Sequence, residues 1–100
     1  MKRVAKVKGI SHYSSNSIQF RGKIEFDLRN EVVYYIWTID SADGELLGMK
    51  SNSISLRTIP QESNPFDFAL PLAIESINKY RVNRKQVFEV VDKEWQDEPA

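Results

Sequence analysis

The stretch IQFRGKIEFDL, residues 18–28, alternates apolar or small residues with polar ones at every position. Because successive side chains of a β-strand project to opposite faces, this pattern predicts a strand with one face in the core and the other in water. The next stretch, residues 32–39, is rich in the β-branched and aromatic residues that strands favour. Together they predict a β-hairpin, which determines the inward and outward faces of the sheet.

The turn of this hairpin is predicted at Arg29-Asn30, because asparagine tolerates the positive φ that tight turns require. That register sets Gly22 opposite Trp37, so the large indole supplies a steric reason for a glycine within a strand. The second strand then points one set of side chains inward (Val33, Tyr35, Trp37 and Ile39) and another outward (Val32, Tyr34, Ile36 and Thr38).

A second turn is predicted at residues 42–44, with Gly44 in a left-handed conformation, and it turns Leu47 and Met49 toward the core. The polar residues 51–53 interrupt the alternation, so we expect a β-bulge there that returns Ile54 to the core face. An opening strand is predicted over residues 3–10, followed by a serine-rich linker.

Apolar residues between positions 65 and 80 repeat at helical spacing. Asn64 suits an N-cap and Pro65 a first helical position, but Pro71 would break a helix interior. We therefore expect a turn over residues 65–69 and a helix over residues 71–80. Residues 83–95 fit either a second helix or a final edge strand, and their β-rich core favours the strand.

The predicted fold class is α+β. It consists of an antiparallel β-meander of three to four strands, one C-terminal helix packed on one face, and a terminal strand or short helix. A chain of 100 residues with 41% hydrophobic composition has the size of a single domain, residues 1–100, and we expect residues 96–100 to fray.

Composition also limits the function. Fourteen basic and fourteen acidic side chains cancel, so no net charge directs the chain to nucleic acid or membrane. No apolar run approaches the roughly 20 residues of a membrane span. The absence of cysteine excludes thiolate chemistry and fits a cytoplasmic location. Residues 1–23 are basic and residues 89–98 acidic, which indicates either a partner surface or mutual neutralisation.

The sequence contains few candidate catalytic residues. His12, the only histidine, lies near Ser14, Ser15 and Ser17, but neither an orienting acid nor an oxyanion hole can be identified from the sequence. The acidic cluster at residues 40–45 lacks the ligand spacing of a calcium loop, and the glycines are too scattered for a phosphate loop. We therefore expect no enzymatic activity, no metal and no cofactor.

The outer face of the predicted sheet remains as a candidate surface. Six residues are predicted to bind a partner, five on this face and one near the C-terminus: Arg21, Lys23, Tyr34, Ile36, Lys50 and Trp95. The face is more apolar than a solvated face should be. Three explanations stay open: cover by the N-terminal segment or residues 83–95, self-association, or a different partner. Trp95 is either a second anchor or a residue that pins the C-terminus to the body.

A non-enzymatic protein-interaction module, such as an inhibitor, adaptor or assembly subunit, is the function that we rank first, and we expect it to dimerise. The alternative is a single-stranded nucleic-acid-binding domain that uses Arg21, Lys23 and Tyr34, since cations beside an exposed ring suit phosphates and bases. Glu25 and Asp27 on the same strand argue against it. A small hydrolase that uses His12 ranks third.

Overall fold

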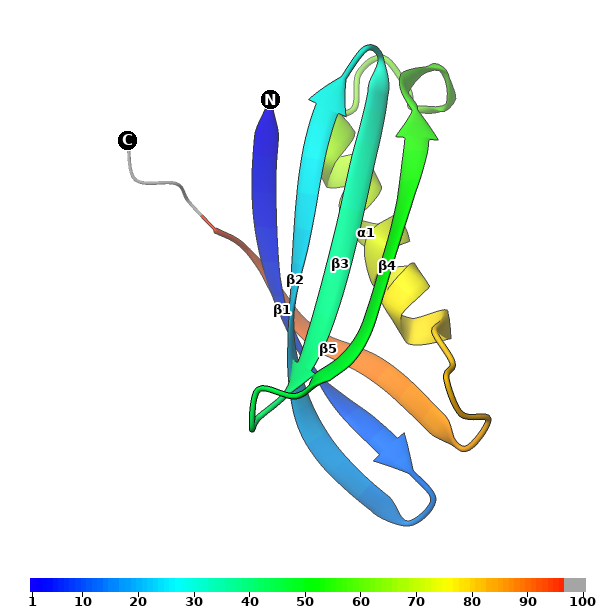
Figure 1. Ribbon diagram of the computed structural model, residues 1–100. Helices are drawn as coiled ribbons and strands as arrows, with labels where there is room; N and C mark the ends of the chain where they lie inside the picture. Colours follow the sequence, from blue (N-terminus) through cyan, green and yellow to red (C-terminus); the bar gives the residue numbers. More distant parts are fainter. Residues whose placement is uncertain (97–100) are drawn as a thin grey trace.

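The computed structural model describes residues 1–96, in which one antiparallel sheet carries one α-helix on a single face (Figure 1). The elements are β1 (Lys2–Tyr13), β2 (Asn16–Arg29), β3 (Val32–Ser41), β4 (Leu46–Ser55), the short 3-10 helix η1 (Leu56–Thr58), α1 (Pro65–Lys79) and β5 (Gln86–Gln96). The sheet order is β4-β3-β2-β1-β5. The α+β class and the antiparallel meander are confirmed, but the sheet has five strands. Of the residues predicted to fray, 97–100 lie outside the described part, and Gln96 ends β5.

The turn between β2 and β3 lies one residue later than predicted, at Asn30-Glu31, where both residues are left-handed with φ of 51° and 63°. Two left-handed residues form a turn whose twist matches that of the flanking strands. The register therefore moves by two residues, and Gly22 opposes Ile39 instead of Trp37. Because a shift of two keeps each side chain on its face, the predicted inward and outward sets of β3 are confirmed.

The turn between β3 and β4 has the predicted form. Gly44 is left-handed, with φ of 85°, and its N–H donates to the Ser41 carbonyl at 2.9 Å. One extra residue at Leu47 then shifts the pairing of β4 with β3. The bulge expected at residues 51–53 is wrong in position, since the pairing continues through them without a shift.

The bulge at Leu47 reverses the faces of β4. Gly48 is buried on the α1 side, whereas Met49, which was predicted to face the core, is exposed. Tyr80, which caps the C-terminus of α1, supplies the reason. A Cβ added at Gly48 would come within 2.5 Å of its ring, and that ring packs against Trp37 with centroids 5.0 Å apart.

β1 and β2 are longer than predicted. They are joined by a tight turn at Ser14-Ser15, so residues 11–17 belong mostly to the strands and are not a linker. This end of the hairpin extends beyond the core. Ile18 was predicted to face the core, but it is exposed.

α1 begins at Pro65 and continues through Pro71, so the prediction of a separate turn before residue 71 is wrong. Asn64 caps the helix as predicted, because its side chain accepts two backbone hydrogen bonds from the first turn. Pro71 lies on the exposed side, where water can hydrate the carbonyl that loses its helical partner. The apolar stripe faces the sheet and contains Phe66, Ala69, Leu70, Ala73 and Ile77.

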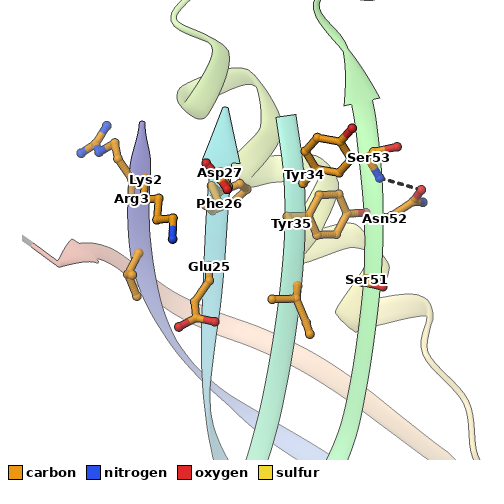
Figure 2. Close-up of a pocket in the computed structure, with 12 residues that line it drawn as sticks. Lys2, Arg3, Glu25, Phe26, Asp27, Tyr34, Tyr35, Ser51, Asn52 and Ser53 are labelled. Atoms are coloured by element: carbon orange, nitrogen blue, oxygen red, sulfur yellow. Dashed lines mark hydrogen bonds between the residues drawn. The ribbon is translucent and has the colours of Figure 1, made fainter. Parts of the chain in front are cut away.

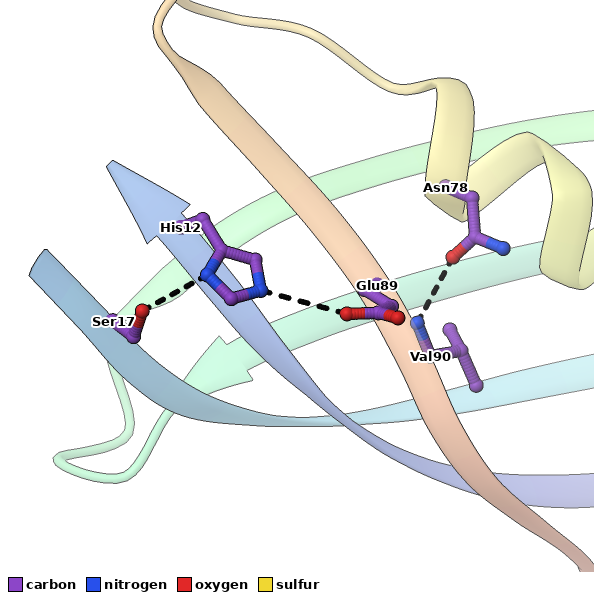
Figure 3. Close-up of polar contacts among 5 residues, drawn as sticks. All are labelled: His12, Ser17, Asn78, Glu89 and Val90. Carbon is purple, nitrogen blue, oxygen red and sulfur yellow. Dashed lines mark hydrogen bonds and ion pairs between the residues drawn. The ribbon is translucent and has the colours of Figure 1, made fainter. Parts of the chain in front are cut away.

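The C-terminal segment forms the strand that the sequence favoured, and it pairs with β1. One extra residue, Val91, lies between the partners of Gly9 and Lys8. This bulge places Phe88 and Trp95 on the same face, although their odd spacing would put them on opposite faces of a regular strand. A side chain of α1 binds the backbone beside this bulge: the Val90 N–H donates a hydrogen bond to Asn78 Oδ1 at 2.9 Å (Figure 3).

Candidate interaction surface on the open face of the sheet

α1 covers one face of the sheet, and the opposite face, which we call the open face, carries no helix of residues 1–96 (Figure 1). Two segments were predicted as covers for this face, the N-terminal segment and residues 83–95. They form β1 and β5, which lie side by side within the sheet. These segments therefore do not cover the open face, and self-association and a different partner stay predictions.

Side chains of the open face form rows across the sheet, and each of the strands β1 to β4 contributes one residue to a central row. The register defines three central rows: Val4, Glu25, Ile36 and Ser51; then Lys6, Lys23, Thr38 and Met49; then Lys8, Arg21, Asp40 and Leu46. The first row has an apolar component, and the other two concentrate positive charge on β1 and β2.

Four exposed cations, which we call the basic cluster, gather on these rows: Lys6, Lys8, Arg21 and Lys23. Lys6 is directly opposite Lys23, and Lys8 is directly opposite Arg21. The cluster lines a hollow of about 640 Å³, which is also lined by three carboxylates, Asp40, Asp92 and Glu94. Like charges directly opposite one another destabilise a sheet, and the acids opposite Lys6, Lys8 and Arg21 on the neighbouring strands offset this repulsion.

The neighbouring carboxylates leave most of the cluster unpaired. The Glu25 carboxylate lies 3.3 Å from Lys23 Nζ, and the Asp27 carboxylate lies 3.0 Å from Arg29 Nε. Among the ion pairs of residues 1–96, none involves the other three cations of the cluster. Those three remain available to an external anion.

The basic N-terminal and acidic C-terminal segments lie side by side. Lys8 opposes Asp92 and Lys6 opposes Glu94 in the pairing of β1 with β5. The two ends therefore lie close together, as one of the two alternatives drawn from the sequence requires, and the acids of β5 form one border of the basic cluster.

Tyr34 lies toward the other end of the open face, where it lines a hollow of about 580 Å³ with Lys2 and Asp27 (Figure 2). The Arg29 guanidinium lies 4.7 Å from the centre of the Tyr34 ring, within the range of a cation–π contact. Tyr34 is still 39% exposed, and Ile36 is 37% exposed. The open face thus presents an aromatic and an aliphatic side chain next to its charged rows.

Four of the six predicted partner-binding residues share the open face: Arg21, Lys23, Tyr34 and Ile36. The prediction that Lys50 lies with them is wrong. The bulge at Leu47 places Lys50 opposite Trp37 on the α1 side, where it lines a groove with Leu72 and Ser76.

Trp95 also lies on the α1 side. Its ring packs against Phe26 with centroids 5.5 Å apart, and the Arg3 guanidinium lies 3.9 Å from its centre. The structure therefore places Trp95 where it ties β5 to the core, the second of the two roles considered from the sequence.

Lys6 and Lys8 are site residues that the sequence reasoning did not select. The alternation of lysine with small or apolar residues over Lys6–Lys8 contains the signal, because it places both lysines on one face of a strand. The missing information was that β1 pairs with β2 so that these lysines meet Arg21 and Lys23.

His12 lies between two polar side chains at the far end of the sheet (Figure 3). Its Nδ1 is 2.9 Å from Ser17 Oγ, and its Nε2 is 3.5 Å from the Glu89 carboxylate. β5 thereby places an acid beside His12, which could not be identified from the sequence alone. All three side chains are exposed, however, and His12 and Ser17 are direct cross-strand partners, as in an ordinary polar pair of a β-hairpin.

Within residues 1–96, no helix is long and apolar enough to cross a membrane, and no three His, Asp or Glu side chains are grouped to hold a metal. No protein-family model matches the chain, and no curated protein and no solved structure matches it significantly. The function is therefore inferred from the geometry of the open face.

Proposed function

We propose that the protein is a non-enzymatic interaction module, such as an inhibitor, adaptor or assembly subunit, which binds a protein partner through the open face. The observation that carries this proposal is the exposure of Tyr34 and Ile36 on a sheet face that no helix of residues 1–96 covers. Apolar and aromatic side chains rimmed by charge are typical of protein interfaces. The cysteine-free composition fits a reducing compartment, and a cytoplasmic location is part of the proposal.

The test compares two doubly substituted proteins as baits in native cell extract. Tyr34→Ser/Ile36→Ser alters the open face. Leu72→Ser/Val82→Ser is the matched control, because Leu72 and Val82 are 39% and 69% exposed and lie on the helix and the following loop. Circular dichroism first establishes that both variants are folded.

A partner that the wild type and the control retain, and that the open-face variant loses, would support the proposal. Equal retention by all three proteins would refute it. Light scattering on the purified proteins covers the case of self-association: a wild-type dimer that becomes monomeric only in the open-face variant identifies the partner as a second copy.

Single-stranded nucleic acid is the alternative occupant, and the observation in its favour is that the basic cluster and Tyr34 share the open face, with the row of Ile36 between them. Arg21→Ala and Tyr34→Ala should then weaken the binding of a dT12 oligonucleotide, and binding should fall steeply with salt. Undetectable binding at about 50 mM salt would remove this alternative.

A hydrolase centred on His12 is the third candidate. The single observation in its favour is that His12 contacts Ser17 through one ring nitrogen and Glu89 through the other. Turnover of p-nitrophenyl acetate should then disappear in both Ser17→Ala and His12→Ala. Turnover that matches the wild type in either variant would exclude the mechanism, because a nucleophile and its base act as a unit.

A further inference from the structure

We propose that the basic cluster recognises an extended acidic segment of the protein partner, with carboxylates at alternate positions followed by an apolar side chain. This inference rests on the proposed function and adds the chemistry of the partner. Its basis is the match between the spacing of the two basic rows and the repeat of an extended peptide.

The spacing follows from strand geometry. Adjacent rows on one face of a sheet are about 6.7 Å apart, because two residues of rise separate them. Side chains at positions i and i+2 of an extended peptide have the same separation. A peptide that lies along β1 and β2 therefore places one carboxylate over Lys8 and Arg21 and the next over Lys6 and Lys23.

The row beyond Lys6 and Lys23 determines which side chain the peptide carries two positions after its second carboxylate. It contains Val4 and Ile36, while its acid, Glu25, is already paired with Lys23. Glu25 lies between Val4 and Ile36 in this row, so an apolar side chain two positions along a peptide that follows β1 and β2 contacts Val4. The partner segment thus has the order acid, any residue, acid, any residue, apolar.

The borders of the cluster favour a short acidic peptide over a nucleic acid. Asp40 lies across from Arg21 on one side, and Asp92 and Glu94 lie across from the lysines on the other. The positive strip is therefore only two strands wide and two rows long. It accommodates two carboxylates, whereas the continued phosphate backbone of a nucleic acid would meet these acids on leaving it.

The experiment uses two synthetic peptides of equal composition and charge, Gly-Glu-Ser-Glu-Ser-Leu-Gly and Gly-Glu-Glu-Ser-Ser-Leu-Gly. Each is titrated into the ¹⁵N-labelled full chain at low salt, and amide shifts are followed by NMR. We expect the alternating peptide to bind more tightly and to shift the amides of the basic cluster and Val4. Lys6→Gln/Arg21→Gln should weaken this binding about fivefold, as expected for two partly screened ion pairs. The control Arg84→Gln/Lys85→Gln, which alters two exposed cations of the loop before β5, should leave it unchanged.

Several results would overturn the inference. These are equal affinity for the two peptides, shifts spread over Arg84 and Lys85 as well, or no binding by either peptide. A dT12 oligonucleotide that binds the cluster more tightly than the alternating peptide would make nucleic acid the occupant. A wild-type dimer that Lys6→Gln/Arg21→Gln dissociates, without any peptide binding, would make it a second copy.

The proposed function can survive the failure of this inference. A partner that Tyr34→Ser/Ile36→Ser loses and Lys6→Gln/Arg21→Gln keeps would show an interaction module whose partner is not acidic. A partner that both variants keep would refute the proposed function itself.

Discussion

The substitution Gly9→Ala probes the close packing of three strands at the bulge in β5. Gly9 lies in β1 between Phe20 of β2 and Val90 of β5. An added Cβ would lie 2.2 Å from the Glu89 carbonyl oxygen and 2.4 Å from Phe20 Cζ. Neither atom can move away easily. The first belongs to the backbone of β5, and the ring of Phe20 is 1% exposed and packs edge-on against Phe88 with centroids 5.7 Å apart.

The expected loss of stability is large for the addition of one methyl group. Overpacking a well-packed core costs about 1–3 kcal/mol, and contacts with both backbone and a buried ring place Gly9→Ala at about 3 kcal/mol. For a chain of this size each kcal/mol lowers the melting temperature by about 4–8 °C, so we expect a decrease of roughly 12–24 °C.

The assay is thermal and urea unfolding followed by circular dichroism, with Gly44→Ala as the matched control. Gly44 has no heavy atom within 4 Å of an added Cβ, but its φ of 85° is strained for alanine. That strain alone costs about 1–2 kcal/mol. Gly9→Ala should therefore be clearly less stable than Gly44→Ala. If the two variants were equally stable, steric contact at Gly9 would not be what shapes this part of the sheet.

Three further substitutions test other parts of the fold. Ser76→Ala removes the acceptor that lies 3.0 Å from the buried Trp37 Nε1–H, and urea unfolding should show a loss of about 1–3 kcal/mol; a loss below that range would mean that water replaces the hydroxyl. Asn64→Ala removes the N-cap of α1 and should cost about 1 kcal/mol in the same assay, whereas Asn64→Asp should retain most of the stability. Trp95→Ala removes a half-buried ring that contacts Arg3 and should cost about 2 kcal/mol, while unchanged stability would show that Trp95 does not tie β5 to the core.

The candidate surface was predictable to the extent that it depends on alternation within one strand. Arg21 and Lys23 alternate with core residues of β2, and Tyr34 and Ile36 alternate with core residues of β3, so their common face followed from the period of two. The hairpin register was wrong by two residues, but an even shift does not exchange the faces of a strand. These four residues therefore lie together despite the misplaced turn.

Lys50 shows where this reasoning fails, and Trp95 is a residue whose face the alternation did not assign. Each follows a bulge, at Leu47 and at Val91, and one extra residue transfers every later side chain to the opposite face. Counting along β4 or β5 cannot reveal where the extra residue lies. The position of the extra residue depends on which distant parts of the chain pack against the strand.

Pro71 shows a related limit at the level of the helix. Its sequence neighbourhood indicated a helix start, because proline removes a hydrogen bond from a helix interior. In the folded protein Pro71 lies on the exposed side of α1, while the apolar stripe from Phe66 to Ile77 packs on the sheet. Burial of that stripe outweighs the lost hydrogen bond, and burial is a property of the packed molecule.

Local pattern alone was thus enough to predict the antiparallel meander, the faces of β2 and β3 and the N-cap at Asn64, since each depends on residues close together in the chain. The faces of β4 and β5 required the folded molecule, because Tyr80 packs on Gly48 and Asn78 binds the backbone of Val90. The same holds for the basic cluster. Its lysines and arginine come from two strands, and only the pairing of β1 with β2 brings them face to face.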